Sequence, residues 1–349
     1  MKTSLFYLMD HYPDRSGPVA DRYAAVIDQS VQAESLGYES VWLAEHHFHQ
    51  LGTLPNPAVM LAAIAARTTT LRLGPAVAVL PMRPPLYTAE NYAMVDNISA
   101  GRLNLGVGSG SSPFELAGVG LDPDQAREAF GGAVAEVERR LAGASAGDLG
   151  YDTLNIAPVQ APCPPMYVTA SSPESAHRAG TQGRSILMIA TPGTPSTAAI
   201  GDRIRAHRAG LSEAGHDPDS RDAVVVAFGF VAPDVDDARS LAGAALARTI
   251  ERMGGPQFDP NDLYDKMVSA GTAVLGDPPQ AAALMQGFAD QGVAHMAFLN
   301  GFGALPIDAN ATSITLLAKA AGHVVPALDA RDTAPTAAKA PAAVHHGHH

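Results

Sequence analysis

The segment Ser40–Leu51, SVWLAEHHFHQL, gives the clearest indication of the fold. Its apolar first half has the composition of a short buried strand, and Glu45, His46 and His47 follow directly after it. Barrel enzymes carry their ionisable active-site groups at the carboxyl ends of their strands. The segment therefore predicts a barrel strand that ends in a candidate active site.

Short apolar runs of this kind alternate with longer helical patterns along the chain. The runs cover residues 4–9, 41–43, 71–80, 103–107, 166–169, 186–189, 224–231 and 294–299. Alternation of strands and helices is typical of parallel βα units. Eight repeats favour a closed barrel over an open doubly wound sheet, so the predicted fold is a TIM-like (β/α)8 barrel of the α/β class.

Five dipeptides predict where helices begin, because each places a side-chain acceptor at the N-cap and proline at the first helical position. They are Asn56-Pro57, Asp122-Pro123, Ser172-Pro173, Thr194-Pro195 and Asp277-Pro278. A glutamine three residues after Asp122 and after Asp277 resembles a capping box.

Two segments interrupt the repeat and predict insertions after strands four and seven. Residues 144–165 are rich in Gly, Ala and Pro, and residues 232–275 contain a helical pattern over 238–253. Insertions at the carboxyl ends of barrel strands lie on the catalytic face. We interpret 251–270 as either a lid or a surface embellishment.

Composition limits the class of protein. The chain has 349 residues, 46% of them hydrophobic, which is enough for one barrel domain over 1–326; the Ala/Pro-rich tail over 327–349 is expected to be disordered. The formal charge of 23 − 35 = −12, without a block of Lys or Arg, argues against a nucleic-acid partner. Cys163 is the only cysteine, which fits a reducing cytoplasm, and no signal-peptide or 18-residue apolar pattern predicts a membrane partner.

The three ionisable residues at the end of the first segment cannot all face the barrel mouth, because side chains alternate along a strand. Either Glu45 and His47 face it together or His46 faces it alone. A metal site is a further interpretation, but the His-Glu-x-x-His pattern of zinc proteases is absent, so no metal ligand is assigned. A histidine that only bonds backbone is the structural alternative, and His49 is expected to be a solvated loop residue.

Two other segments have the composition of ligand sites. Gly106-x-Gly108-x-Gly110 lacks the spacing of the dinucleotide fingerprint, but glycines there allow a flat or anionic ligand to approach the backbone. Ser171, Ser172 and Ser175 lie where a helix begins, and unpaired N–H groups and the helix dipole favour a phosphate there. An ordinary N-cap by Ser172 is the alternative, and it is compatible with a phosphate site.

Taken together, these motifs resemble those of the luciferase-like flavin-dependent monooxygenases, the bacterial luciferase superfamily. The similarity runs over about residues 1–325. The matching segments are VWLAEHHF at 41–48, LGPAVAVLP at 73–81, Ala89-Glu90 through Asp96, Ser99-x-Gly101-Arg102-Leu103-x-Leu105-Gly106-Val107-Gly108, Tyr167-Val168-x-Ala170-Ser171-Ser172 and Gly276-Asp277-Pro278.

The resemblance implies a barrel that binds reduced FMN (FMNH2) at the carboxyl ends of its strands. Reduced flavin would react with O2 to a C4a-(hydro)peroxide that oxygenates a small organic substrate. His46 matches the histidine that assists proton transfer beside the flavin and is the implied catalytic residue. Ala76–Val77 matches the segment under the isoalloxazine ring, often through a non-prolyl cis peptide. The implied cofactor-binding residues are Glu45, Ala76, Val77, Gly108, Ser109, Ser171, Ser172 and Ser175.

One departure from the family pattern affects the flavin site. Relatives commonly carry a cysteine–arginine pair after strand four, where this chain has Gly108-Ser109. Without that arginine, the serine loop and the helix terminus are left to hold the phosphate. Without the cysteine, we expect additional room beside the flavin.

The resemblance also implies partners. No dinucleotide fingerprint accompanies the barrel, so reduced flavin would come from a separate NAD(P)H:flavin reductase. Helices over 57–68 and 85–98 would form a homodimer interface. Two alternatives on the same fold are an F420-dependent oxidoreductase and a non-catalytic flavin-binding protein. The aromatic residues that could exclude water from the site, or belong to the barrel core instead, are Phe6, Tyr7, Phe48, Phe228, Phe230, Phe298 and Phe302.

Overall fold

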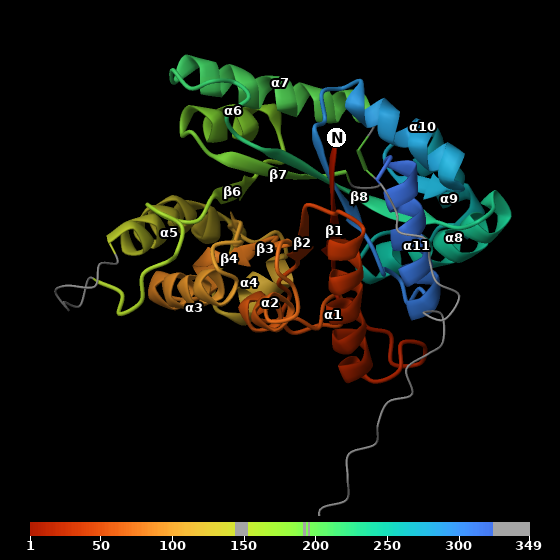
Figure 1. Cartoon of the computed structure of the whole chain (residues 1–349), viewed down its shortest axis with the longest axis horizontal. Helices are drawn as coiled ribbons and strands as arrows, with labels where there is room; N and C mark the ends of the chain where they lie inside the picture. The colour runs from red at the N-terminus through yellow and green to blue at the C-terminus, as the bar shows by residue number, and fades with distance from the viewer. Residues whose placement is uncertain (144–152, 191–192, 195, 324–349) are drawn as a thin grey trace, which may run out of the picture.

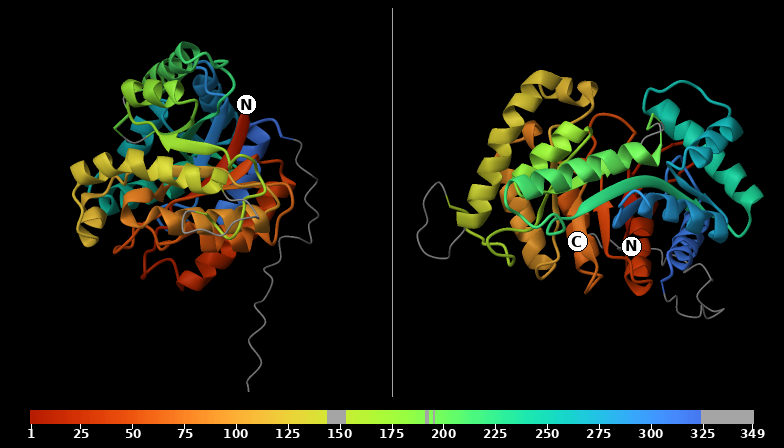
Figure 2. Two further views of the ribbon diagram at one scale, coloured as in Figure 1. Left: turned by 90° about the vertical axis from the view of Figure 1, so that its left-hand side faces the viewer. Right: turned by 90° about the horizontal axis from the view of Figure 1, so that it is seen from above.

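A computed structural model describes residues 1–143, 153–190, 193–194 and 196–323. Within them an all-parallel sheet curls into a TIM-like barrel, and helices lie around its outside (Figures 1 and 2). The strands are β1 (Lys2–Tyr7), β2 (Ser40–Leu43), β3 (Arg72–Pro75), β4 (Ala78–Val79), β5 (Leu105–Gly108), β6 (Met166–Thr169), β7 (Ser185–Ile189), β8 (Ala223–Val231), β9 (Val274–Gly276) and β10 (His295–Leu299). None of the described helices is long and apolar enough to cross a membrane.

The barrel closes within the third predicted run. The order of paired strands begins at β3 and ends at β4, and these two are consecutive pieces of one run interrupted at Ala76–Val77. β3 pairs with β2, while β4 pairs with β5. A parallel bridge between Leu73 and Leu103 joins the two edges. The predicted single strand over 71–80 is therefore two short strands, and the other seven predicted runs each overlap one strand.

The helices fill the connections between strands. They are α1 (Val19–Ser35), α2 (Pro57–Ala65), α3 (Pro85–Ile98), α4 (Pro113–Gly118), α5 (Pro123–Gly143), α6 (Pro173–Thr181), α7 (Thr197–Glu213), α8 (Val235–Arg252), α9 (Pro260–Ser269), α10 (Pro278–Ala289) and α11 (Ile307–Ala320), with a 3-10 turn η1 at Leu80–Met82.

Four of the five predicted helix starts are confirmed. Asn56, Ser172 and Asp277 accept N-cap hydrogen bonds, and Asp122 forms a reciprocal capping box with Gln125. The start at Thr194-Pro195 is wrong, because α7 begins at Thr197 after the N-cap Ser196, and Pro195 lies outside the described residues.

The two predicted insertions differ in structure. In the first, residues 153–165 contain no helix or strand, as the composition predicted, and residues 144–152 lie outside the described part of the chain. The second holds α8, α9 and the unpredicted strand β9, which extends the sheet from the far end of β8. Leu263, Tyr264 and Met267 are buried, so the second half of the predicted lid is a packed helix. The tail over 327–349 also lies outside the described residues.

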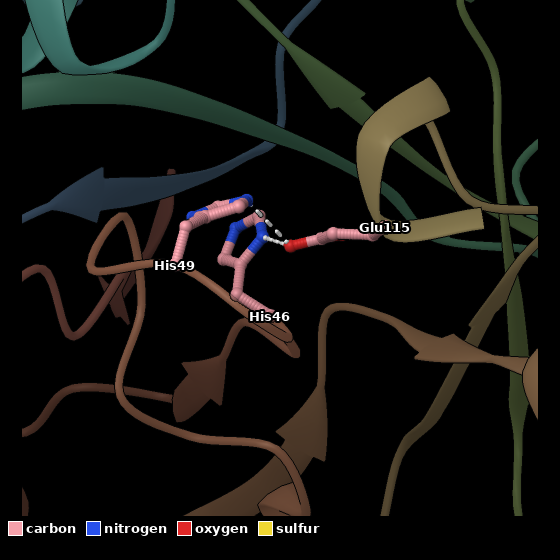
Figure 3. A group of neighbouring side chains, drawn as sticks. All are labelled: His46, His49 and Glu115. Atoms are coloured by element: carbon pink, nitrogen blue, oxygen red, sulfur yellow. Dashed lines mark hydrogen bonds and ion pairs between the residues drawn. The ribbon is translucent and has the colours of Figure 1, made fainter. Parts of the chain in front are cut away.

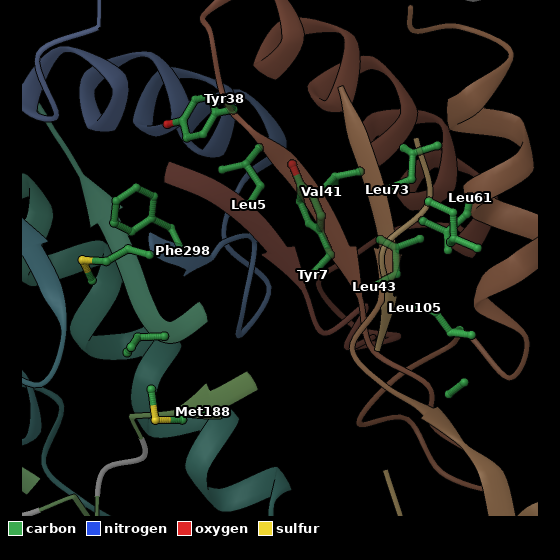
Figure 4. Packing of buried hydrophobic residues seen from close by; sticks show 14 of the residues in the cluster. Leu5, Tyr7, Tyr38, Val41, Leu43, Leu61, Leu73, Leu105, Met188 and Phe298 are labelled. Carbon is green, nitrogen blue, oxygen red and sulfur yellow. The ribbon is translucent and has the colours of Figure 1, made fainter. Parts of the chain in front are cut away.

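Strand alternation divides the hydrophobic core into two clusters. Leu5 and Tyr7 of β1 belong to a cluster that packs under the helices (Figure 4), and Phe6 belongs to a second cluster with Trp42. Trp42 is fully buried, with its ring centroid 5.1 Å from that of Tyr167. A Cβ on Gly74 would lie 2.5 Å from the Trp42 ring, so this position of β3 has no room for a side chain. Of the seven candidate aromatic residues, all except Phe48 are buried in the core.

Candidate active site

The end of β2 distributes its three ionisable residues between two separate clusters. The first contains Glu45 and His47, whose Oε1 and Nε2 atoms are 3.1 Å apart. Arg83, just after η1, donates to the same carboxylate oxygen. The Glu45 side chain is fully buried, so it reaches the site only through these two partners.

His46 points to the second cluster, together with His49 and Glu115. Nδ1 of His46 and Nε2 of His49 each lie 2.9 Å from Oε1 of Glu115 (Figure 3). The two histidines come from the loop after β2, whereas Glu115 comes from α4, after β5. This cluster therefore joins two parts of the barrel rim whose strands, β2 and β5, are separated by β3 and β4. Strand alternation correctly predicted that His46 and the pair Glu45–His47 point in different directions.

Hydrogen bonding keeps Glu115 ionised. Burial raises the pKa of Glu115, but hydrogen bonds from the His46 side chain and the His47 N–H outweigh burial and hold the pKa below its ordinary value. Burial lowers the pKa of His49, and the neighbouring Glu115 only partly offsets this effect. At neutral pH the cluster therefore contains a carboxylate and an uncharged His49.

The cluster has the residue types of a metal site, and its candidate ligand atoms lie within 4.8 Å of one another. However, the N–H of Leu51 donates to Nδ1 of His49 at 3.1 Å. Nδ1 therefore carries no proton, and the proton of the neutral ring is on Nε2, which faces Glu115. A metal bound at Nε2 would require the opposite tautomer, so this geometry favours hydrogen bonds over metal ligation.

The link between β3 and β4 has the conformation that the resemblance implies. The Ala76–Val77 peptide bond is cis, and both residues are partly exposed. A Cβ on Gly108 would lie 2.5 Å from Cγ2 of Val77 and 3.5 Å from Cγ2 of Thr169. The expectation that Gly108 leaves room beside a flavin is therefore wrong, because the Val77 side chain fills that space.

Several strand ends beside this link leave side chains open at the barrel rim. Thr169 ends β6 and Ile189 ends β7, and both are exposed although the rest of each strand is buried. Val77 contributes apolar surface, and Ser109 is partly exposed at the end of β5. Because β4, β5, β6 and β7 are consecutive neighbours, their ends form one surface with an apolar floor and hydroxyl groups.

The predicted serine loop lies at the start of α6. Ser172 and Ser175 form a reciprocal capping box, with Ser175 N–H donating to Oγ of Ser172 at 3.2 Å and Ser172 N–H donating to Oγ of Ser175 at 3.0 Å. A hydrogen bond from Ser172 also lowers the pKa of Glu174. Ser171 is exposed and makes no side-chain hydrogen bond with the other described residues. The Ser171 hydroxyl is therefore free for a ligand, whereas the other two already serve the helix.

A cavity of about 290 Å³ lies between the predicted lid and the loop after β1. Its lining residues are Arg15, Ala244, Ala247, Arg248, Glu251, Gln257, Phe258 and Pro260. At its border, Arg252 stacks on Tyr12 at 4.3 Å and donates to Gln50 in the histidine loop. Of the predicted lid, the end of α8, the turn after it and the first residue of α9 border this space.

The sequence analysis missed three residues of these clusters. Glu115 and Arg83 were not selected, and His49 is a partner of Glu115 instead of the expected solvated residue. The sequence Ser112-Pro-Phe-Glu115 has capping-box spacing, and Ser112 does cap α4. That spacing predicts a local role for Glu115, whereas its side chain reaches the histidine loop.

Comparison with known proteins places these features in a family. The family model described as luciferase-like monooxygenase matches residues 1–295. The oxygenase component of the flavin-dependent trigonelline monooxygenase of Acinetobacter baylyi is 30% identical over 186 residues, half of each chain. The F420-dependent glucose-6-phosphate dehydrogenase of Kineococcus radiotolerans is 30% identical over 295 residues, 78% of this chain and 85% of that protein.

The fold is also found in solved structures. The monooxygenase RslO1 from Streptomyces bottropensis superposes with a TM-score of 0.83 at 26% identity, covering 91% of this chain and 98% of that one. In sequence, the chain spans about half the length of several curated relatives that it matches, between 46% and 56%.

Proposed function

This chain belongs to the luciferase-like monooxygenase family, and from that premise we propose that it is the oxygenase component of a two-component flavin-dependent monooxygenase. Its cofactor would be reduced FMN, its second substrate O2, and its organic substrate a small molecule. The observation that carries the proposal is the position of His46, held by Glu115 at the barrel rim with no partner for Nε2 among the described residues.

The residues at the rim fit a flat aromatic group that carries a phosphate. Val77 and Ile189 offer an apolar surface against which a ring can lie, and Thr169 and Ser109 offer hydroxyl groups at its edge. The start of α6 offers a helix N-terminus and the free hydroxyl of Ser171, which suit a phosphate. The buried Glu45 would not touch the ligand itself but would hold His47 and Arg83 in position beside it.

When bound, reduced flavin would supply two electrons, so that one atom of O2 enters the substrate and the other leaves as water. The protein's own contribution would be orientation, exclusion of water and proton transfer. Nε2 of His46 would exchange the proton that the reaction requires. The partly buried position of His46, 16% exposed, limits the access of bulk water to that atom.

The second candidate function is that of an F420-dependent oxidoreductase. The long match to the F420-dependent dehydrogenase of Kineococcus radiotolerans favours it. A deazaflavin would lie on the same apolar floor, and His46 would exchange a proton with the substrate during hydride transfer. The two candidates differ in whether O2 is consumed.

Two partners belong to this proposal. The similarity to an oxygenase component supports a separate NAD(P)H:flavin reductase as the source of reduced flavin. A homodimer is supported by the exposed apolar side chains of Val59 on α2 and of Tyr87, Met94 and Ile98 on α3. These helices are neighbours, so the four side chains belong to adjoining surfaces.

The test is turnover of the purified chain with photoreduced FMN under ¹⁸O₂, against a panel of aldehydes, amines, sulfur compounds and aromatic compounds. We expect one ¹⁸O atom in the product of at least one class. Parallel reactions with reduced F420, without O2, test the second candidate. Oxidation of F420 coupled to substrate reduction, without oxygenation by reduced FMN, would replace the first candidate by the second. Flavin binding without any turnover would favour a non-catalytic binding protein.

A further inference from the structure

We propose that Glu115 is a positioning residue that fixes His46 as the Nδ1–H tautomer, so that Nε2 is the atom left to exchange protons with a bound ligand. The role of His46 in catalysis rests on the proposed function. The tautomer itself does not, because it follows from the geometry of this chain.

Three donors converge on one oxygen of Glu115. Oε1 lies 2.9 Å from Nδ1 of His46, 3.0 Å from the backbone N of His47 and 2.9 Å from Nε2 of His49. A carboxylate only accepts hydrogen bonds, and the backbone N–H only donates. Nδ1 of His46 must therefore carry the proton in this contact, which leaves a lone pair on Nε2.

His49 is held in the opposite tautomer by a different neighbour. The N–H of Leu51 donates to Nδ1 of His49, so the proton of that ring is on Nε2. The ring centroids of His46 and His49 are 5.8 Å apart, yet their protons are on different nitrogens. Both protons point to Glu115, and this arrangement is specific enough to be tested atom by atom.

The helix that carries the Glu115 carboxylate is fixed at its start and by packing against the loop after β2. Glu115 is only 4% exposed, and Ser112 caps the helix that carries it. Phe48 packs against Gly118 of the same helix so closely that a Cβ there would overlap its ring. The loop after β2 is therefore docked on α4, and the carboxylate has little freedom to leave His46.

The surroundings of His46 contain few other charges. His49 is the second partner of Glu115, and Arg252 on α8 reaches the same loop at Gln50. The ion pair of Glu45 with Arg83 lies on the other side of the strand end. When Nε2 of His46 accepts a proton, Glu115 is therefore the carboxylate that compensates the new charge directly.

The experiment measures the tautomer directly by long-range ¹H–¹⁵N correlation on the full chain labelled with ¹⁵N-histidine. It is done at about pH 8.5, where ordinary imidazoles are neutral. His46→Gln assigns the His46 signals by their loss. In the unsubstituted protein we expect the Nδ1–H pattern for His46 and the Nε2–H pattern for His49. An Nε2–H pattern for His46 would overturn the proposal, whether or not the protein oxygenates anything.

The variant Glu115→Gln removes the charge and keeps the size of the side chain. We expect mixed tautomers of His46 and an activity lower by about 10- to 100-fold. Glu128→Gln, on the exposed face of α5, is the matched control and is expected to leave both unchanged. An unchanged tautomer of His46 in Glu115→Gln would overturn the proposal. Loss of activity alone would not support it.

Discussion

Val77 occupies the space in front of Gly108: a Cβ on that glycine would lie 2.5 Å from Cγ2 of the valine. The two residues belong to the segments that the resemblance assigns to the flavin, one in the link between β3 and β4 and the other at the end of β5. Glycine at 108 is thus required by the neighbouring side chain. A cysteine, which the resemblance implies at this position, would overlap the Val77 side chain where it lies.

This contact predicts the effect of Gly108→Ala. The new methyl group displaces Val77, so we expect a loss of about 1–3 kcal/mol in the free energy of unfolding and weaker flavin binding. Urea unfolding and fluorescence titration with FMN measure the two effects. Gly131→Ala is the control, because its Cβ would meet nothing within 4 Å on α5. Equal stability and flavin affinity in the two variants would show that the close contact is not real.

A partly buried hydrogen-bond network at the amino end of the barrel predicts a pH effect on stability. Asp222 bonds Nδ1 of His295 at 2.6 Å, and Nε2 of His295 bonds Ser4 at 2.7 Å. Burial raises the pKa of Asp222, but the contact with His295 outweighs burial and lowers the pKa overall. The stabilisation is therefore present above the unfolded-state pKa of about 4 and is lost as the pH falls through the lower folded-state pKa.

The variant Asp222→Asn tests this hydrogen-bond network. We expect the variant to be less stable by about 2–3 kcal/mol at pH 7, and its stability to depend less on pH below about pH 4. We expect activity to persist, because these hydrogen bonds lie at the opposite end of the barrel from His46. Asp219→Asn, which removes an exposed ion pair with Arg208, is expected to cost less than about 1 kcal/mol. If the stability of Asp222→Asn and of the unsubstituted chain depends on pH in the same way during acid denaturation, Asp222 does not link stability to pH.

The serine loop predicts that stability and phosphate binding depend on different hydroxyls. Ser172→Ala removes the N-cap of α6 and should cost about 1 kcal/mol of stability. Ser171→Ala should leave stability unchanged and weaken binding of FMN, while binding of riboflavin, which lacks the phosphate, stays the same. Thermal unfolding and fluorescence titration distinguish the two. If Ser171→Ala weakens FMN and riboflavin equally, the phosphate is not at this loop.

Much of the fold could be predicted from the sequence because its signals are local. Apolar runs predicted the positions of most strands, and acceptor–proline pairs predicted where four helices begin. The break at Ala76–Val77 and the strand β9 were missed, because residues 73–80 are continuously apolar across the break and β9 has only three residues. Thr194-Pro195 has the same chemistry as the other helix starts, but Ser196 occupies the N-cap position of α7.

The candidate site was predicted only where its residues are close in sequence. The separation of His46 from Glu45 and His47 follows from strand alternation and needed no tertiary information. Glu115 is 69 residues from His46 and meets it because the loop after β2 and the helix after β5 lie at the same rim of the barrel. No local sequence pattern predicts this tertiary contact, so the residue that orients His46 could be identified only from the structure.

The most direct test of the account compares His46→Gln with the unsubstituted chain in single turnovers with reduced FMN and ¹⁸O₂, using the substrate found in the panel. We expect the variant to bind FMN nearly as well as the unsubstituted chain, while ¹⁸O-labelled product falls by about 100-fold or more and hydrogen peroxide is released instead. Product formation by His46→Gln at the rate of the unsubstituted chain would contradict the account, because His46 would then not be the residue that exchanges the proton.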